Sequence, residues 1–425
     1  MKRVLIISYY WPPSGGSGVQ RWVKFAKYLP SESWQPVIYT PENPELLVLD
    51  ERLGDEVPNV VEIIKTPILE PYSLYKRLFV RSKKTEVNPI NHQEKSVFQK
   101  FSMWIRGNFF IPDPRSLWIR PSVKFLKKYL KENPVDVIIS TGPPHSMHLI
   151  AQKLSKITGL PWIADFRDPW TKMFYFKHLN LSSWAERKHK KLEQSVLDDA
   201  TAIVAVSPLV KEEFELMTQT PVHLITNGYD EEDFDINIEA DSSFNITHTG
   251  LFASDGNPDR LWEVLAEKAA EDIEFKEKLR LRLVGKTDNE IIKSIIKLGL
   301  ESNLVDRGYQ PHKEAVGEQK CADLLLLPLR KEPEYRATLP GKLFEYLAAK
   351  KPVLGIGQRD GAMAKILEET GAGEVYDWEE KKEIKKYIDK AWCLFKEGRF
   401  EINPNGLEKY SRKNTTKQMV ELMNF

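Results

Sequence analysis

The chain has very few of the residues that build disulfide frameworks or structural metal sites. It contains two cysteines, Cys321 and Cys393, and eight histidines in 425 residues, with no His-Glu-x-x-His motif. Two thiols cannot form a disulfide framework, and such low cysteine use is typical of the reducing cytosol. Structural zinc needs about four Cys or His ligands at short spacing. The sequence therefore predicts a cytoplasmic protein without a bound metal ion.

Long apolar runs and an excess of charge of either sign are also missing. No stretch approaches the roughly 20 apolar residues that span a membrane. The opening MKRVLIISYYWPP places basic residues before apolar ones, but prolines end its apolar core too soon for a signal peptide. A net charge of +1 provides no general attraction to nucleic acid. We therefore expect no nucleic-acid partner, and any membrane contact must be peripheral, on the inner face.

Three common enzyme motifs are absent or incomplete. There is no G-x-x-x-x-G-K-[ST] loop of the P-loop kinases, and GPPHSM does not fit the G-x-S-x-G elbow of α/β-hydrolases. The loop SGGSGVQ is only loosely similar to G-x-G-x-x-G, and no acidic residue clearly ends the second predicted strand. A dinucleotide-dependent oxidoreductase is therefore disfavoured.

What the chain does contain is short apolar runs that alternate with longer amphipathic segments. Near-continuous apolar strands separated by helices, as at 145–157 and 183–198, indicate a parallel sheet covered on both faces. The pattern occurs in both halves, which predicts an α/β fold of two Rossmann-like domains facing a cleft. The predicted strands are 3–8, 36–40, 60–65, 135–140, 161–165 and 202–207, then 244–250, 279–285, 322–329 and 351–357.

A polar, acidic and turn-rich stretch at 227–243 separates the two halves and suits a linker. After a Pro-Asn-Gly stop, the last residues have the periodicity of a helix, which can cross back to the first domain. The predicted boundaries are 1–228 for the N-terminal domain, 229–240 for a hinge, 241–398 for the C-terminal domain and 399–425 for the C-terminal helix.

Three glycines in four positions follow the first predicted strand and precede a helix. They are Gly15, Gly16 and Gly18. Glycine leaves the backbone open to close approach, and a helix start offers free N–H groups to an anion. A turn that only connects two elements does not need three glycines, so we predict a ligand loop.

The stretch RATLPGKLFEYLAAKKPVLGIG, 336–357, places a charged helix between two apolar strands. Pro340 and Gly341 open the helix, and Lys342 and Glu345 lie in its first turns. Ligands of open α/β sheets bind at the carboxyl edge, where this helix begins. A carboxylate there can accept two hydrogen bonds from a sugar or ribose diol, and the helix start with Lys342 can receive phosphate charge. The alternative is that Glu345 is a solvated helix residue.

The segment PGKLFEYLAAKKPVLGIG resembles the nucleotide-binding segment of retaining glycosyltransferases of the group 1 type, which have the two-domain GT-B fold. YYWPPSGGSGVQR is similar to that family's glycine-rich first loop, and DATAIVAVSPLVKEEF, ITNGYDEEDF and HTGLF resemble its later motifs in order. The resemblance implies that the C-terminal domain binds a nucleotide-sugar of the UDP or GDP type. It also implies transfer with retention, without a cofactor, to a glycan or lipid-linked glycan of cell-envelope polysaccharide held by the N-terminal domain.

The chain departs from the family's E-x7-E pattern in the C-terminal half. Ala337 stands where the first glutamate is expected, and Glu345 corresponds to the second, which contacts the nucleotide ribose. The backbone from Thr338 onward is then left to contact the donor sugar. The candidate substitutes for the usual Arg and Lys after the first C-terminal strand are Lys286, Arg260 and Lys342, of which only Lys342 is well placed by the sequence. The donor-binding residues implied are Gly15, Gly16, Gly18, Gly250, Lys286, Thr338, Leu339, Pro340, Gly341, Lys342 and Glu345.

The N-terminal half departs from the family at one position. Arg167, followed by Asp168, stands where the family often has His before Asp. A guanidinium does not exchange a proton near neutral pH, so Arg167 suits an acidic sugar or a phosphate instead. His145 opens a helix at another strand end and is either a packing residue or a contact to the acceptor. The predicted catalytic residues are Arg167, Asp168 and His145.

Two alternatives remain open. One is a non-catalytic protein of the same fold that binds a nucleotide-sugar or a lipid carrier, which Ala337 favours. The other is a nucleotide-sugar epimerase or hydrolase. Turnover of labelled donor with and without a lipid acceptor separates the three functions.

The segment 76–131 carries a strong local charge. It holds fourteen Lys and Arg residues against three acidic ones, interleaved with Phe98, Phe101, Trp104, Phe109, Phe110 and Trp118. A basic surface with aromatic rings suits an anionic membrane face. The alternative is a solvated insertion whose rings pack into its own domain.

Overall fold

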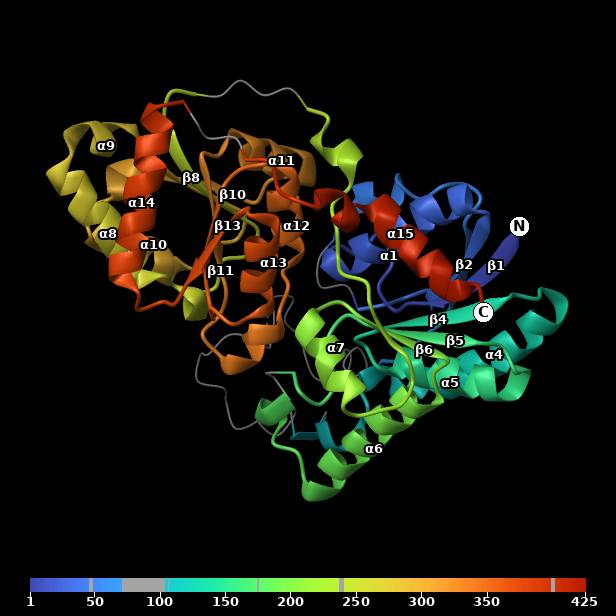
Figure 1. Ribbon diagram of the computed structural model, residues 1–425. Coiled ribbons are helices and arrows are strands. Elements are labelled where there is room, and N and C mark those ends of the chain that lie inside the picture. The colour runs from blue at the N-terminus through green and yellow to red at the C-terminus, as the bar shows by residue number, and fades with distance from the viewer. Residues whose placement is uncertain (46–48, 71–103, 106, 174–175, 237–240, 399–401) are drawn as a thin grey trace, which may run out of the picture. The chain divides into compact units, whose positions relative to one another are not determined.

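The computed structural model describes the chain apart from residues 46–48, 71–103, 106, 174–175, 237–240 and 399–401 (Figure 1). It has two compact units. Unit 1 comprises Met1–Thr226 together with Thr416–Phe425, and unit 2 comprises Asn227–Thr415.

Unit 1 is built on a seven-stranded sheet in which every strand pair is parallel. Its interior strand β1 (Lys2–Ile7) is apolar and fully buried from Val4 onward, because helices cover both faces. Across the sheet the strands are β3 (Glu62–Thr66), β2 (Trp34–Pro41), β1, β4 (Val137–Gly142), β5 (Trp162–Phe166), β6 (Ala202–Ala205) and β7 (Val222–Leu224).

Two helices from opposite ends of the chain share one face of this sheet. They are α1 (Ser17–Tyr28) and α15 (Arg412–Met423), both labelled in Figure 1. Trp22 and Met419 belong to one core cluster with Ile6 of β1. The C-terminal helix thus begins in unit 2 and ends in unit 1. Further helices of unit 1 are α4 (Ile119–Glu132), α5 (Ser146–Thr158), α6 (Ser183–Asp199) and α7 (Pro208–Glu215).

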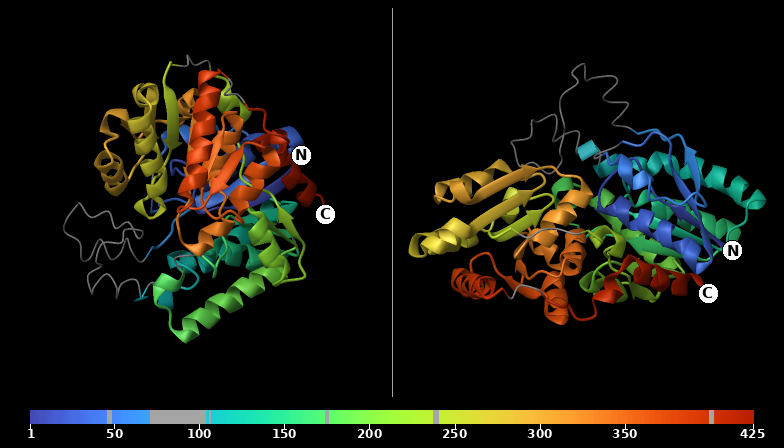
Figure 2. Two further views of the ribbon diagram at one scale, coloured as in Figure 1. Left: turned by 60° about the vertical axis from the view of Figure 1, so that its left-hand side comes forward. Right: turned by 90° about the horizontal axis from the view of Figure 1, so that it is seen from above.

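Unit 2 repeats the design with a six-stranded sheet whose pairs are again all parallel (Figure 2). Across the sheet the strands are β10 (Leu304–Gly308), β9 (Leu279–Val284), β8 (Phe244–Thr249), β11 (Leu324–Pro328), β12 (Val353–Ile356) and β13 (Gly373–Tyr376). The helices are α8 (Asp259–Glu271), α9 (Ile273–Lys278), α10 (Asn289–Lys297), α11 (His312–Cys321), α12 (Gly341–Ala348), α13 (Ala362–Thr370) and α14 (Lys381–Lys396). The prediction of two Rossmann-like α/β domains is confirmed.

The strand order places the two expected site regions. In each sheet the order reverses beside the first strand, between β1 and β4 in unit 1 and between β8 and β11 in unit 2. Open α/β sheets bind ligands at the carboxyl ends of the strands at such a reversal. The glycine-rich loop leaves β1 at this point, and Gly250 leaves β8 at the equivalent point.

None of the helices in the described part of the chain has the length and apolar character that crossing a bilayer requires.

Candidate functional site

Helix α12 brings the charged residues of unit 2 to the carboxyl edge of the sheet. Pro340 is its N-cap, with the extended backbone that a helix start requires. Leu343, Phe344, Tyr346 and Leu347 are buried and hold the helix against the sheet. Lys342 and Glu345 lie in the first turns of the same helix, at positions that these buried residues do not occupy.

The Glu345 carboxylate is held at both oxygens. His312 Nε2 lies 3.1 Å from Oε1, and Gln319 Nε2 donates to Oε2 at 2.8 Å. Burial alone would raise the pKa of this carboxyl, but the donors of His312 and Gln319 and the nearby charge of Lys342 outweigh it, so the pKa lies below its usual value. Glu345 is therefore ionised at neutral pH. Its side chain keeps 19% exposure, so a ligand can reach it.

Lys342 is held beside a neutral histidine. Its Nζ lies 3.2 Å from His248 Nε2 and 3.4 Å from the Leu251 carbonyl. His248 Nδ1 lies 3.0 Å from the Leu326 carbonyl, which can only accept, so Nδ1 carries the proton and Nε2 accepts from Lys342. Burial and the Lys342 charge lower the pKa of His248 well below its usual range. Burial also lowers the pKa of Lys342 to about 8, because Glu345 offsets only part of the desolvation.

Gly250 leaves room for the Lys342 ammonium group. Its φ of 92° lies in the left-handed region that favours glycine. A Cβ there would lie 3.2 Å from Lys342 Nζ, so any larger residue would crowd the cation. The short connection after β8 therefore exposes backbone next to a positive charge, which is an arrangement suited to an anionic ligand.

The other donor-binding candidates of unit 2 lie around this edge with different exposure. Lys286 follows β9, where its carbonyl accepts from Phe252 N, and its side chain is exposed. Leu339 is buried, whereas Thr338, Pro340 and Gly341 are half-buried at the start of α12. Ala337 ends a 3-10 turn, Pro333–Ala337, and brings no polar side chain to the edge.

In unit 1, the glycine-rich loop makes room for Arg167. Gly16 is the N-cap of α1 and has a φ of 105°, while Gly15 is half-buried. A Cβ on Gly18 would overlap a terminal nitrogen of the Arg167 guanidinium. Arg167 also donates to the carbonyls of Gly142 and Pro143, which fixes its head group beside the start of α1. The structure thus brings together two predicted groups that are far apart in the sequence.

His145 lies at the start of α5 and is 3% exposed. Its ring stacks on Trp170 at 4.6 Å, and neither ring nitrogen has a hydrogen-bond partner among the residues that the structure describes. Burial and the nearby His148 and Arg167 lower the pKa of His145 well below its usual range, so the ring is neutral. A neutral imidazole offers one donor and one acceptor, which suits a hydroxyl group.

Asp168 follows Arg167 and is half-buried. Burial raises the pKa of its carboxyl to about 6, because the Arg167 charge offsets only part of the desolvation. Asp168 can therefore hold a proton slightly below neutral pH, which Arg167 cannot do.

A buried ion pair joins α1 and β5 at this edge of unit 1. Arg21 of α1 and Asp165 of β5 have no exposed side-chain surface and pair at 2.8 Å. Asp165 also accepts from Trp22 Nε1 at 3.0 Å and Thr141 Oγ1 at 2.9 Å. The carboxylate therefore ties α1, β4 and β5 together just beneath the glycine-rich loop.

Sequence reasoning missed three residues of the unit 2 site, namely His248, His312 and Gln319. His248 stands two residues before Gly250 in the HTGLF stretch, which was a usable signal. His312 opens a helix soon after β10, but that strand was not predicted, so its place at the sheet edge was hidden. Gln319 is an ordinary polar residue inside a helix, and nothing in its local sequence points to Glu345.

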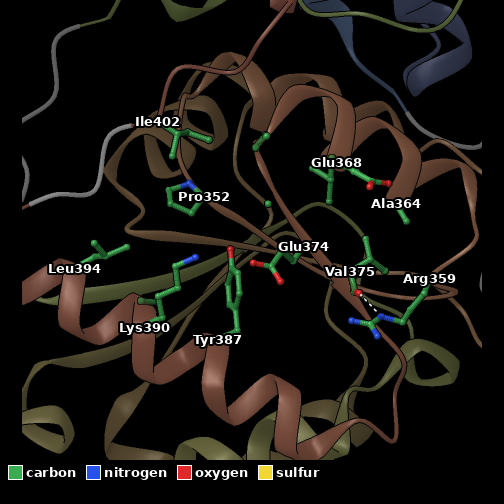
Figure 3. A pocket seen from close by; sticks show the side chains of 15 residues that line it. Pro352, Arg359, Ala364, Glu368, Glu374, Val375, Tyr387, Lys390, Leu394 and Ile402 are labelled. Carbon is green, nitrogen blue, oxygen red and sulfur yellow. Dashed lines mark hydrogen bonds between the residues drawn. The ribbon is translucent and has the colours of Figure 1, made fainter.

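A cavity of about 600 Å³ lies elsewhere in unit 2, along the free edge of β13 (Figure 3). Tyr387, Lys390 and Glu374 are among the residues that line it. None of the donor-binding candidates does. No group of three or more His, Cys, Asp or Glu residues suited to a metal ion occurs in the described ranges.

The two units have the architecture of a GT-B glycosyltransferase, and solved structures of this kind superpose along the whole chain. Sucrose-phosphate synthase from Thermosynechococcus elongatus is 14% identical, with a TM-score of 0.63, over 99% of this chain and 98% of that one. Anabaena HepE in complex with UDP is 15% identical, with a TM-score of 0.63, over 100% and 99%. WaaG, a glycosyltransferase involved in lipopolysaccharide biosynthesis, is 16% identical, with a TM-score of 0.57, over 99% of both chains.

Two family models of glycosyltransferases match the sequence. Residues 95–233 match the model of Glycosyltransferase Family 4, and residues 230–394 match that of Glycosyl transferases group 1. Together these matches run from residue 95 to residue 394, and they support a group 1 glycosyltransferase. No significant match was found among curated protein sequences.

Proposed function

We propose that this glycosyltransferase moves a hexosyl group from a UDP- or GDP-type nucleotide-sugar to a glycan or lipid-linked glycan, with retention at the anomeric carbon. The observation that carries the proposal is that Glu345 and Lys342 both lie on α12 at the carboxyl edge of the sheet in unit 2. One is an anchored carboxylate and the other a cation beside open backbone. Together they provide a diol acceptor and a diphosphate receptor on one short helix.

In this proposal, residues of α12 and the segment before it contact the nucleotide-sugar donor. Glu345 accepts hydrogen bonds from the ribose hydroxyls, and Lys342 with the amides at the start of α12 binds the diphosphate. The backbone from Thr338 to Gly341 contacts the sugar in place of the missing glutamate at Ala337. That the neighbour HepE was solved with UDP supports a nucleotide diphosphate as the ligand.

Unit 1 takes the acceptor in this proposal. Arg167 is fixed by two backbone carbonyls and suits a phosphate or an acidic sugar. His145 is neutral and has unused hydrogen-bonding capacity, which suits an acceptor hydroxyl. A phosphate-bearing lipid carrier fits both contacts. The role of WaaG in lipopolysaccharide biosynthesis supports an acceptor from cell-envelope polysaccharide.

The reaction breaks the bond between the anomeric carbon and the diphosphate oxygen and forms one to the acceptor oxygen. The departing phosphate takes the proton that the acceptor hydroxyl loses, so no protein base is needed at the anomeric carbon. Lys342 and the helix start stabilise the negative charge that develops on the leaving diphosphate. Because these groups carry that charge, we expect transfer without a divalent metal ion.

Labelled UDP- and GDP-sugars, each incubated with and without a lipid-linked glycan, test the proposal. Transfer predicts label in the acceptor and none in free sugar. Label released as free sugar without acceptor indicates a hydrolase, and a changed sugar still on its nucleotide indicates an epimerase. Binding without any turnover supports the non-catalytic alternative.

We also propose that α4 brings unit 1 to an anionic membrane surface. Its residues Arg120, Lys124, Lys127, Lys128 and Lys131 are all exposed, together with the Phe125 ring. Trp104 and Phe109 are exposed too, whereas Trp118 is buried and stacks on Tyr39, so it packs within its own unit. Lys83, Lys84, Phe98 and Phe101 of the predicted basic segment lie outside the described residues.

A further inference from the structure

Gln319 connects Glu345 to the end of a strand. It is 1% exposed on α11, and its amide nitrogen donates to Glu345 Oε2 at 2.8 Å and to Thr249 Oγ1 at 3.1 Å. A carboxylate only accepts, so the amino group and not the amide oxygen must face Glu345. Thr249 is fixed in turn, because its backbone N–H donates to the buried Tyr346 hydroxyl at 2.9 Å. Gln319 thus ties the carboxylate to the buried end of β8.

The orientation of Gln319 leaves a buried acceptor unused. Its Oε1 has no hydrogen-bond partner among the described residues. A buried polar atom without a partner costs stability, and such a group in a native protein needs an explanation. One amide hydrogen holds Glu345 and the other holds Thr249, which explains the presence of a glutamine at this buried position.

His312 holds the other carboxylate oxygen from the start of the same helix. Its Nε2 lies 3.1 Å from Glu345 Oε1, and its side chain is 35% exposed. An imidazole N–H facing a carboxylate donates to it. The two contacts come from opposite ends of α11, so the carboxylate cannot rotate without breaking one of them.

A count of lone pairs shows what this leaves for a ligand. A carboxylate has about four acceptor sites, two on each oxygen. Among the residues that the structure describes, His312 and Gln319 take one site on each oxygen, which leaves one site on Oε1 and one on Oε2. Two hydroxyls on adjacent carbons match two fixed acceptors on one carboxylate.

We propose that Gln319 and His312 are positioning residues that orient Glu345 for a ribose diol, and that they set a preference for ribonucleotides over deoxyribonucleotides. This inference rests on the proposed function, because it assigns the diol to Glu345. A freely rotating carboxylate can turn so that it accepts hydrogen bonds from one hydroxyl and from water. A fixed carboxylate cannot, so loss of either hydroxyl leaves one oriented acceptor without its partner.

The test compares dissociation constants for UDP, 2′-deoxy-UDP and 3′-deoxy-UDP, and for GDP with its 2′-deoxy and 3′-deoxy analogues, by calorimetry. The wild-type chain should prefer the ribonucleotide by about tenfold or more. Gln319→Met and His312→Phe should reduce that preference to about threefold or less, and raise the donor KM more than they lower kcat. His312→Gln keeps an N–H donor and should restore most of the preference.

Glu318→Gln is the matched control on the same helix. Glu318 pairs with Arg282 at 2.8 Å and Arg307 at 3.2 Å, away from Glu345. This variant should lower the melting temperature and leave the ribose preference unchanged, which separates positioning from general stability. Because His312 is partly exposed, His312→Phe should fold even if Gln319→Met does not.

Glu345→Ala distinguishes a failure of the proposed function from a failure of the positioning role alone. If it binds UDP and GDP like the wild type, the ribose role of Glu345 is wrong and the proposed function loses its main support. If Glu345→Ala loses the preference while Gln319→Met and His312→Phe keep it, Glu345 binds the diol without their help. That second result overturns the positioning role alone.

Discussion

If Lys342 receives the diphosphate as proposed, its charge makes nucleotide binding depend on pH in a defined direction. Burial lowers the pKa of its ammonium group to about 8 in the free protein. A bound diphosphate favours the charged form and raises that pKa. Binding is therefore strongest below pH 8, where the lysine is already protonated, and weakens above pH 8, where it must take up a proton.

The size of the effect follows from the same pKa. With a value of about 8, the free lysine is roughly nine-tenths protonated at pH 7 and one-tenth protonated at pH 9. The affinity for UDP or GDP should therefore fall about tenfold between those two values, or about 1.4 kcal/mol. The ligand's own phosphates are already ionised above pH 7, with a second pKa near 6, so they do not cause the fall.

Calorimetry at pH 7, 8 and 9 and constant ionic strength measures this dependence. Lys342→Met should bind weakly at every pH, with a flat profile, because a thioether does not titrate. Lys297→Met removes an exposed lysine on α10 and should keep the wild-type profile. Wild-type affinity that stays constant from pH 7 to pH 9 refutes the reasoning, since it would mean that Lys342 does not meet the phosphates.

Four further outcomes are expected. Glu345→Ala should weaken nucleoside diphosphate binding by about 1–3 kcal/mol in calorimetry, the cost of a charge-assisted hydrogen bond, and unchanged affinity argues against the ribose contact. Gly18→Ala should push the Arg167 guanidinium aside and reduce transfer by up to about 100-fold at a nearly constant melting temperature. Normal turnover of this variant would show that the glycine-rich loop is an ordinary turn. Transfer should survive EDTA, and a requirement for Mn²⁺ or Mg²⁺ contradicts the proposed handling of diphosphate charge. Substitution of Lys127 and Lys128 by Glu should weaken binding to anionic vesicles, measured by sedimentation, by about 1 kcal/mol per residue. If the wild-type chain stays in the supernatant at low salt, α4 is a solvated helix and does not bind the membrane.

The strands that sequence reasoning missed share one physical property. β7, β10 and β13 each lie at the edge of a sheet and pair with a single neighbour. Edge strands are covered less, so they do not need the apolar run that marks a central strand. The half-exposed residues of β10 show this, whereas the buried Leu324 to Leu327 of β11 were recognisable from their composition alone.

The sequence by itself determined the class of fold and the charged residues at the start of α12. Apolar runs with helices between them require parallel sheets, and a Pro-Gly entry beside Lys342 and Glu345 is visible without coordinates, because these are short-range patterns. Only the tertiary structure decided what holds those groups. Gln319 and His312 reach Glu345 across the packing of two helices, and Gly18 meets Arg167 only after β1 and β5 join one sheet. Such contacts depend on how distant segments pack, and no local pattern encodes which residue will lie opposite another.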